Sequence, residues 1–319
     1  MKLFDKANFA FIEKRRRAYA FSVALILVGL AAMFSNVFSL GRWQNYGVDF
    51  TGGSLIQVEF HQPTNATELR AALGGSQAPS ITRFGDENEF TIRAPLGNDS
   101  VETIGARFQN ELAAAFGNDV FTILRTETVG PKIGAELERN ALLAVLFSFF
   151  VTLIYIAMRF ELRFGLAAVI ATVHDIMITL GFLAMFRVEI ALPTVAAILT
   201  IVGYSLNDTI VVFDRVRENL NAKGGRRRDP VELVNHSINE TLPRTVLTSG
   251  TTLAVLLALL FVGGAVIRDF TLVLILGVAV GTYSSIFVAA PALLEIQKRF
   301  GDGSTSRERR KKRGAPATA

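Results

Sequence analysis

The chain has 319 residues, of which 50% are hydrophobic and 19% charged, and its formal net charge is +5. This composition is typical of a membrane protein rather than of a soluble domain. The sequence holds no cysteine, which excludes disulfides, thiol catalysis and cysteine metal sites. Its three histidines lie too far apart in the sequence to favour a histidine-rich metal centre.

Six apolar runs are each long enough to cross about 30 Å of hydrocarbon as a helix, which takes roughly 20 residues. They lie at 18–40, 140–158, 164–186, 191–213, 245–263 and 270–293. The first run follows "EKRRR", but it is too long for a signal peptide and lacks a cleavage site of small residues. The sequence therefore predicts a polytopic α-helical membrane protein with six transmembrane helices, the first an uncleaved anchor.

The distribution of Lys and Arg predicts the orientation. Segments 1–17, 159–163, 214–244 and 294–319 carry 23 of the 33 basic residues. The positive-inside rule places these segments, and with them both termini, in the cytoplasm, and places segment 41–138 outside. For the basic tail "RERRKKRG" we favour a topology signal or a contact with anionic membrane lipid, and we expect no nucleic acid partner.

The external segment 41–138 has a regular pattern of elements. We expect a strand at 53–60, a helix at 65–73 capped by Asn65 and Glu68, a hairpin from 80–84 and 89–93, a helix at 99–116 and a strand at 120–129. The order β-α-β-β-α-β predicts a small α+β ferredoxin-like domain. This fold hosts many functions and by itself says little about activity.

The stretch "YGVDFTGGS" precedes the first strand and contains Gly52 and Gly53. It is a poor phosphate cradle, because no Lys-Ser/Thr follows and no helix begins directly after the glycines. A conformational role in a tight turn into the first strand fits better.

In the inner segment 214–244, the fourth helix is expected to run on through "DRVREN" and to break at "KGGRRR". A new helix then begins, with Asp229 as its N-cap and Pro230 in its first turn. Its apolar residues recur on one face. This face suits a helix on the inner membrane surface or against a partner, and it equally suits packing against the chain's own bundle.

Asp208 is the most informative residue, because it lies roughly 26 Å along the fourth span by helical rise. A carboxylate at that depth costs of order 3 kcal/mol and should face a partner or a wet cavity. Thr200 and Tyr204 share its helix face, and Asn207 precedes it. We favour proton or ion handling over the alternative, a structural carboxylate bonded to a neighbouring helix.

Arg244 is a candidate counter-charge for Asp208, since it starts the fifth span at a similar depth. The alternative is a basic residue whose side chain reaches to the inner surface, as the positive-inside rule allows. His174 and Asp175 form a second polar insertion, in the third span. They suit either hydrogen bonding between helices or a proton relay.

Four motifs carry a family resemblance: "GVDFTGG" at 47–53, "VHD" at 173–175, "GYSLNDTIVVFDRVREN" at 203–219 and "LPRTVLTSGTTLA" at 242–254. With them the chain resembles the SecF family of the bacterial SecD-SecF translocase accessory complexes, relatives of the resistance-nodulation-division transporters. The resemblance covers nearly the whole chain. The fourth-span motif is long and specific, whereas the external domain matches by layout more than by sequence.

The resemblance implies that Asp208 is the family's essential proton-pathway aspartate and Arg244 its essential arginine. It implies a multi-pass protein of the bacterial inner membrane that pairs with SecD, each supplying one six-helix half. It further implies work with SecA, the SecY-SecE-SecG channel and YajC on an unfolded preprotein. The coupling ion would be the proton, with no other cofactor and no hydrolytic activity.

Three other functions are weaker on the sequence. An intramembrane aspartyl protease would use Asp175 and Asp208 as a proton-sharing pair, but the flanking Gly-x-Gly-Asp of such enzymes is missing. An efflux half-transporter of the same superfamily would have larger external domains and both halves in one chain. A purely structural role, in which the chain only braces SecD, stays open.

Overall fold

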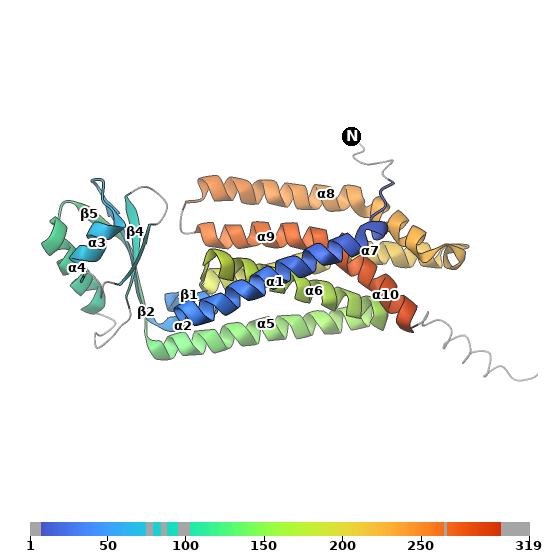
Figure 1. Cartoon of the computed structure of the whole chain (residues 1–319), viewed down its shortest axis with the longest axis horizontal. Coiled ribbons are helices and arrows are strands. Elements are labelled where there is room, and N and C mark those ends of the chain that lie inside the picture. Colours follow the sequence, from blue (N-terminus) through green and yellow to red (C-terminus); the bar gives the residue numbers. More distant parts are fainter. Residues whose placement is uncertain (1–7, 75–78, 84–87, 95–102, 265–266, 301–319) are drawn as a thin grey trace, which may run out of the picture.

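The computed structural model describes residues 8–74, 79–83, 88–94, 103–264 and 267–300. It is an elongated molecule, with a helical bundle and a small α+β domain at one end of it (Figure 1). The bundle helices are η1 (Ile12–Lys14), α1 (Arg15–Leu40), α5 (Pro131–Arg159), α6 (Leu162–Phe186), α7 (Leu192–Asn221), η3 (Gly225–Arg227), α8 (Pro230–Val262), α9 (Arg268–Ser284), η5 (Ser285–Ala289) and α10 (Ala290–Phe300).

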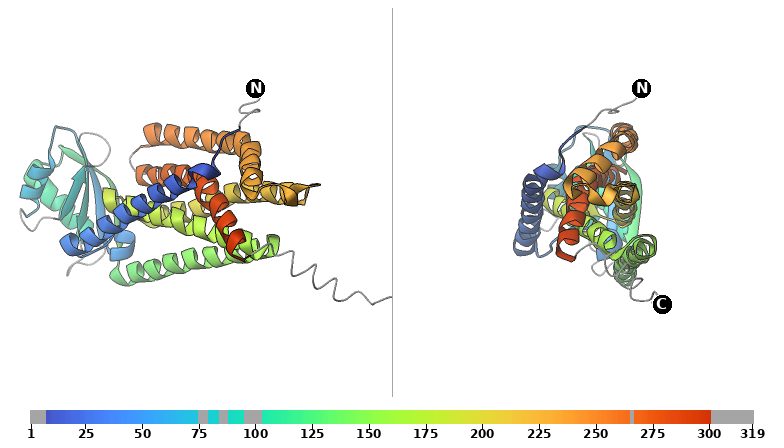
Figure 2. Two further views of the ribbon diagram at one scale, coloured as in Figure 1. Left: turned by 45° about the vertical axis from the view of Figure 1, so that its right-hand side comes forward. Right: turned by 90° about the vertical axis from the view of Figure 1, so that its right-hand side faces the viewer.

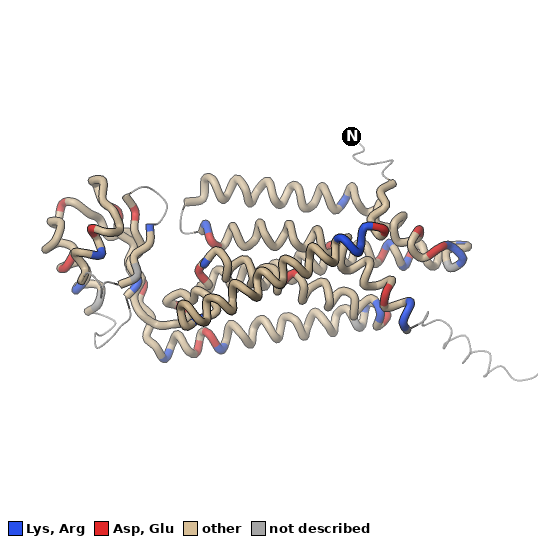
Figure 3. The backbone as a smooth tube through the Cα atoms, in the orientation of Figure 1, with Lys and Arg blue, Asp and Glu red and all other residues tan. Residues whose placement is uncertain are grey.

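Six helical stretches in the described part are long and apolar enough to cross a membrane, which confirms the prediction of six. In α6, α7 and the stretch that begins with α9, 50 to 56% of the residues in the apolar 18-residue segment are buried. The corresponding share is 6% in α1 and α5 and 17% in α8. The first three therefore form the centre of the bundle. Charged residues gather towards its two ends, and long stretches of helix between them carry few charges (Figure 3).

One expected division between helices was wrong. The inner helix and the fifth span were expected to be separate, but α8 runs through both as one helix with Pro243 inside it. Proline removes one backbone hydrogen bond and bends a helix rather than always ending it, and Figure 2 shows α8 sharply bent. The sixth span is not a uniform α-helix either, because the π-helical turn η5 separates α9 from α10.

The start of α8 was predicted correctly, and the structure shows what its apolar face packs against. The Asp229 carboxylate accepts hydrogen bonds from the backbone N–H groups of Val231 and Glu232, both at 3.1 Å. The apolar face of this helix is buried in the same core as residues of α7. The N-terminal part of α8 thus packs against the chain's own bundle. The buried residues of this face are Leu233, Val234, Ile238 and Leu242.

The small domain follows the predicted order of elements: β2 (Gly53–Phe60), α3 (Ala66–Ala72), β3 (Ser80–Arg83), β4 (Glu89–Ala94), α4 (Thr103–Phe116) and β5 (Phe121–Val129). Residues 99–102, the predicted start of the second helix, lie outside the described part. The strands form one antiparallel sheet in the order β3-β4-β2-β5. Asn65 caps α3 as predicted, accepting from the N–H groups of Thr67 and Glu68.

The chain passes from α1 into the sheet through β1 (Asn45–Tyr46) and the short helix α2 (Val48–Thr51), neither of which was predicted. Gly52 and Gly53 follow with φ angles of +69° and +125°. Residues that carry a Cβ atom rarely adopt such positive φ angles. A Cβ atom on Gly52 would also lie 2.9 Å from the Cα atom of Pro131, at the start of α5. This geometry fits the conformational role expected of the two glycines.

The outer helix α1 lies directly against α6 where two glycines meet. A Cβ atom built on Gly29 would lie 2.6 Å from the Cα atom of Gly181, and one on Gly181 would lie 2.8 Å from the Cα atom of Gly29. Small residues at such contacts let helix backbones approach closely in a membrane.

We expect Gly181→Ala to lower the free energy of unfolding by about 1–3 kcal/mol, because the added methyl group overpacks this contact. The measurement is unfolding of the purified protein in mixed micelles, followed by circular dichroism. Gly250→Ala in α8 is the matched control, since a Cβ atom there meets no heavy atom within 4 Å. Equal stability of the two variants would contradict the close approach.

Candidate functional site

Asp208 lies on α7 at the centre of the bundle, and its side chain is buried. Its Oδ1 atom accepts a hydrogen bond of 2.8 Å from the Thr245 hydroxyl of α8. Its Oδ2 atom accepts one of 2.6 Å from the Ser285 hydroxyl, the first residue of η5. The carboxylate therefore joins three helical elements, and its hydrogen-bond donors in the described part of the chain are both hydroxyl groups.

Arg244 does not form an ion pair with Asp208 within 4.0 Å among the described residues, and its side chain is exposed. It precedes Thr245, so it points about 100° away around α8. Arg244 lies at nearly the same level along the bundle as Asp208, since the next residue bonds the carboxylate, but this level does not determine which face of a helix a residue occupies. In this chain, Thr245 rather than Arg244 contacts the Asp208 carboxylate.

His174 and Asp175 form a second buried polar group, on α6. Asp175 Oδ1 lies 2.8 Å from His174 Nδ1, and Asp175 Oδ2 accepts hydrogen bonds from Ser205 of α7 and, at 2.7 Å, from Ser284 of α9. The His174 Nε2 atom lies 2.9 Å from the hydroxyl oxygen of Ser22 in α1. Hydrogen bonding between helices is thus present, and a relay role stays a prediction.

Four consecutive residues, Thr282, Tyr283, Ser284 and Ser285, connect these groups, and sequence reasoning missed them. Their side chains contact, in order, Ser249, Ser22, Asp175 and Asp208. Tyr204, also a predicted site residue, donates to Ser249 at 3.2 Å and so belongs to the same network. The signal in the sequence was the run "TYSS" inside an otherwise apolar span.

The two serines each have two acceptors within reach. The Ser285 hydroxyl lies 2.6 Å from Asp208 Oδ2 and 3.0 Å from the Thr282 carbonyl oxygen. Ser284 is placed in the same way, 2.7 Å from Asp175 Oδ2 and 3.1 Å from the Gly281 carbonyl oxygen. A hydroxyl has one hydrogen to donate, so each serine bonds either the carboxylate or the backbone. Single π-helical turns of this kind are frequent at functional sites.

Asp175 and Asp208 do not form a hydrogen-bonded carboxylate pair in the described part of the chain. Each is bonded to its own set of hydroxyls, and no hydrogen bond links the two within the described ranges. A proton shared between two carboxylates requires that they be in direct contact. The arrangement therefore gives no support to an aspartyl protease.

The polar face predicted for α7 is divided between two surroundings. Asp208 is buried and Tyr204 half-buried within the chain, whereas Thr200 and Asn207 are exposed. Gly203 lies between the exposed residues, and a Cβ atom on it would meet nothing within 4 Å. The exposed stripe of α7 is thus small and polar, unlike the large apolar side chains on the outer faces of α1 and α5.

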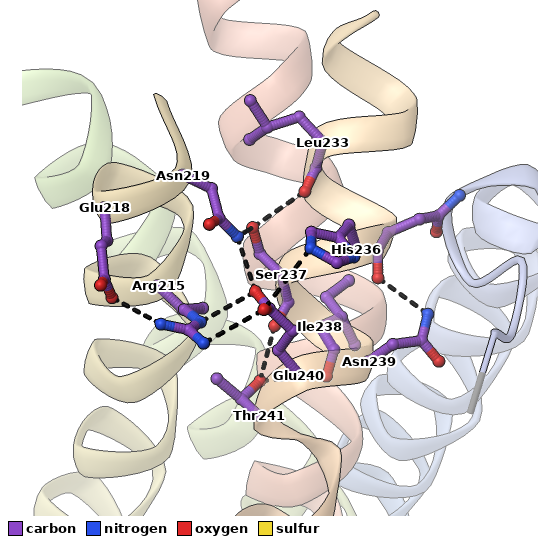
Figure 4. A network of polar contacts seen from close by, with 11 residues as sticks. Arg215, Glu218, Asn219, Leu233, His236, Ser237, Ile238, Asn239, Glu240 and Thr241 are labelled. Atoms are coloured by element: carbon purple, nitrogen blue, oxygen red, sulfur yellow. Dashed lines mark hydrogen bonds and ion pairs between the residues drawn. The ribbon is translucent and has the colours of Figure 1, made fainter. Parts of the chain in front are cut away.

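A polar network joins the C-terminal part of α7 to the N-terminal part of α8 (Figure 4). Arg215 of α7 donates to both carboxylate oxygens of Glu240, at 2.8 and 3.1 Å, and also to Glu218. Asn219 donates to Glu240 and to the Ser237 hydroxyl, at 2.8 and 2.9 Å. Such two-point contacts between Arg and a carboxylate constrain orientation.

Comparisons with known proteins identify the family. The model of the SecD/SecF protein export membrane protein, C-terminal region, matches residues 107–299, and the SecD/SecF GG motif matches residues 45–64, which include Gly52 and Gly53. Protein translocase subunit SecF of Gemmatimonas aurantiaca is 43% identical over 330 residues, with 100% of this chain and 97% of the relative covered. Protein translocase subunit SecF of Desulfurispirillum indicum is 47% identical over 294 residues, with 90% of this chain and 91% of the relative covered.

Two solved structures are also similar. The crystal structure of SecDF from Thermus thermophilus, a translocon-associated membrane protein, matches with a TM-score of 0.81 and 40% identity over 94% of this chain. A second SecDF crystal structure, in a super-membrane-facing form, matches with a TM-score of 0.66 and 38% identity over 95% of this chain. This chain spans 40% of the length of each. By sequence along its whole length and by fold, the chain belongs to the SecF family of protein translocase subunits.

Proposed function

We propose that the chain is the SecF half of a SecD-SecF complex that uses the proton-motive force to complete preprotein translocation at the periplasmic face. The observation that carries this proposal is the buried carboxylate of Asp208, held by two hydroxyls at the centre of the bundle. A buried intramembrane carboxylate is costly and marks a functional site by default.

A proton on Asp208 would reverse one of its hydrogen bonds. The ionised carboxylate only accepts, and Ser285 then donates to it. The protonated group donates a hydrogen bond itself, so Ser285 is free to donate to the Thr282 carbonyl oxygen instead. Protonation thus changes the bonding of the π-helical turn and of the α9-α10 junction. Charge transfer across the membrane supplies about 2.3 kcal/mol per 100 mV, enough to shift a two-state element more than tenfold.

Arg244 enters this scheme through a movement of α8. A rotation of about 100° would bring Arg244 to the place of Thr245 beside Asp208. We propose that the ionised and protonated forms of Asp208 favour different positions of α8, with Arg244 near the carboxylate when it is charged. The His174-Asp175 group serves as a supporting relay, because Ser284 and Ser285 join the two carboxylates to adjacent residues.

The partner half would pack on the exposed stripe of α7. Small and polar residues at a helix surface in a membrane are typical of helix-helix contacts rather than of lipid contacts. Sites at the contact between two halves are the general arrangement in repeat-built transporters. Supporting this, the similar SecDF structures are longer chains, of which this chain matches 40%.

The remaining assignments rest on the family and on charge placement. We propose a multi-pass location in the bacterial inner membrane, with both termini cytoplasmic. The sheet domain, whose strand order suits the ferredoxin-like type, then lies in the periplasm. The working partners are SecA, the SecY-SecE-SecG channel, YajC and an unfolded preprotein. The proton is the sole coupling agent, without hydrolytic activity in this chain.

We expect Asp208→Asn to lower the gradient-dependent part of preprotein export by roughly tenfold or more, since the amide binds no proton. The measurement is export into vesicles containing the full complex, with and without a proton gradient. Asp214→Asn is the matched control, as Asp214 lies on the same helix but is exposed and paired with Arg159. Undiminished gradient stimulation in Asp208→Asn would rule out the proposed function.

We expect Ser285→Ala to reduce gradient-driven export roughly tenfold while the complex still assembles, because one charge-assisted hydrogen bond to Asp208 is lost. The same vesicle assay measures it. Ser39→Ala removes a serine that bonds only its own helix on the exposed face of α1 and should leave export unchanged. If both variants export equally well, the hydroxyl exchange at η5 has no part in coupling.

Arg244→Met tests whether the chain takes part in proton coupling or only supports SecD structurally. We expect this variant to assemble with SecD and to lose most gradient-dependent export, roughly tenfold, since the exposed guanidinium contributes little to the chain's own fold. Co-purification measures assembly and the vesicle assay measures export. Normal export by an assembled Arg244→Met complex would support the bracing role instead.

A further inference from the structure

The contact between the small domain and the outer end of α7 contains a partly buried ion pair. Arg93 of β4 donates through Nη2 to the Glu189 carboxylate, which belongs to the two-residue strand β6 (Glu189–Ile190). The two side chains are 21% and 12% exposed. Burial lowers the pKa of Arg93, and Asp269 at the start of α9 partly offsets this. Most of the Arg93 side chain is thus shielded from water, and loss of its partner is more costly there than at a fully exposed position.

Both ends of this ion pair are firmly held. Arg93 lies in an inner strand, opposite Leu55 of β2 on one side and Ser80 of β3 on the other. Glu189 lies opposite Asn45 of β1, and its carbonyl oxygen accepts a 2.9 Å hydrogen bond from Thr194 in the first turn of α7. A displacement of the end of α7 therefore reaches Glu189, and a force on Arg93 reaches the whole sheet.

The motif at 47–53 lies beside this carboxylate and beside the start of α7. A Cβ atom on Gly47 would lie 2.5 Å from Glu189 Oε1, so a side chain at position 47 would displace the carboxylate. Asp49 accepts a 2.8 Å hydrogen bond from the backbone N–H of Leu192 and so caps the outer end of α7. Gly47 and Asp49 thus place the start of α7 and its neighbour Glu189, a role that composition and spacing did not suggest.

Beside the ion pair, the domain and the bundle are separated by a cavity. A cavity of about 540 Å³ lies there, lined by Asp49, Arg93, Glu189, Asp269 and Phe270 among others. The covalent links of the sheet to the bundle are at Gly52-Gly53, where β2 begins, and at Gly130, after β5. Beside this cavity, the ion pair of Arg93 and Glu189 is a direct polar contact between the sheet and the segment that leads into α7.

We propose that Arg93 and Glu189 are positioning residues that transmit movements of α7 to the external domain. The inference rests on the proposed function, since it assigns the route from Asp208 to the domain. When α7 shifts at Asp208, Glu189 moves with its outer end and carries Arg93, and the sheet turns about Gly52-Gly53 and Gly130. Without the ion pair, the domain follows α7 less closely, through its covalent links and through the packing of α2 on the sheet.

The test uses the full complex in vesicles and two variants, Glu189→Gln and Arg93→Gln. Because the chain has no cysteine, spin labels are introduced at Thr67→Cys in the domain and Ser39→Cys on α1, both exposed positions. We expect each variant to broaden the distance distribution between the labels and to lower gradient-driven export roughly five- to tenfold, as for a moderate coupling between two sites. Gly47→Ala, which keeps both charges but displaces the carboxylate, should act in the same direction.

The double variant Arg93→Glu with Glu189→Arg should narrow the distribution again and restore most of the export. Glu111→Gln is the matched control, because it breaks an exposed pair with Arg107 on α4 of the same domain, and it should change neither readout. Unchanged distances and export in both single variants would overturn the proposal, as would a double variant no better than the singles. If Asp208→Asn abolishes gradient stimulation in that case, the proposed function stands and only the transmission route fails.

Discussion

The structure depends on one constraint: a carboxylate at the centre of an apolar bundle must have hydrogen-bond donors within reach. Asp208 satisfies it with Thr245 and Ser285, which lie on two different helical elements. Those elements must therefore approach α7 closely. Gly281 and Gly277 of α9 permit this, since Cβ atoms there would lie 2.9 Å from Ser205 Cβ and 2.1 Å from Ile201 Cγ1. The close approach of these helices to α7 thus accounts for the hydrogen bonds of the carboxylate and for the central position of α7 and α9.

The helix α7 connects three of the polar features described above. It has 30 residues, or about 45 Å of length at 1.5 Å per residue. Asp49 and Glu189 hold its outer end, Asp208 lies in its middle, and Arg215 anchors its inner end to α8. A continuous helix of this length transmits displacement along its axis. The outer ion pair and the inner network therefore lie at the two ends of one rigid body that carries the carboxylate.

Much of this arrangement was predictable because it follows local rules. Hydropathy located the six spans, and N-cap chemistry placed the starts of two helices at Asn65 and Asp229. The π-helical turn was not predictable, since helical periodicity gives no sign of it and the serines read as ordinary small residues. The continuity of α8 through Pro243 was not predicted, although a packed helix can continue through proline with a bend. Arg93 and Glu189 are 96 residues apart, and only the folded chain brings them together.

The same geometry explains how a half-molecule can hold its own carboxylate and still depend on a partner. Asp208 points into the chain, while Asn207 before it points about 100° away and is exposed. Since both are on one rigid helix, any rotation of α7 that follows a change at Asp208 must also change the surface around Asn207 and Gly203. A second half packed on that surface would sense the charge of Asp208 without touching it. Coupling between the halves then requires no shared hydrogen bond, only a common helix with two faces.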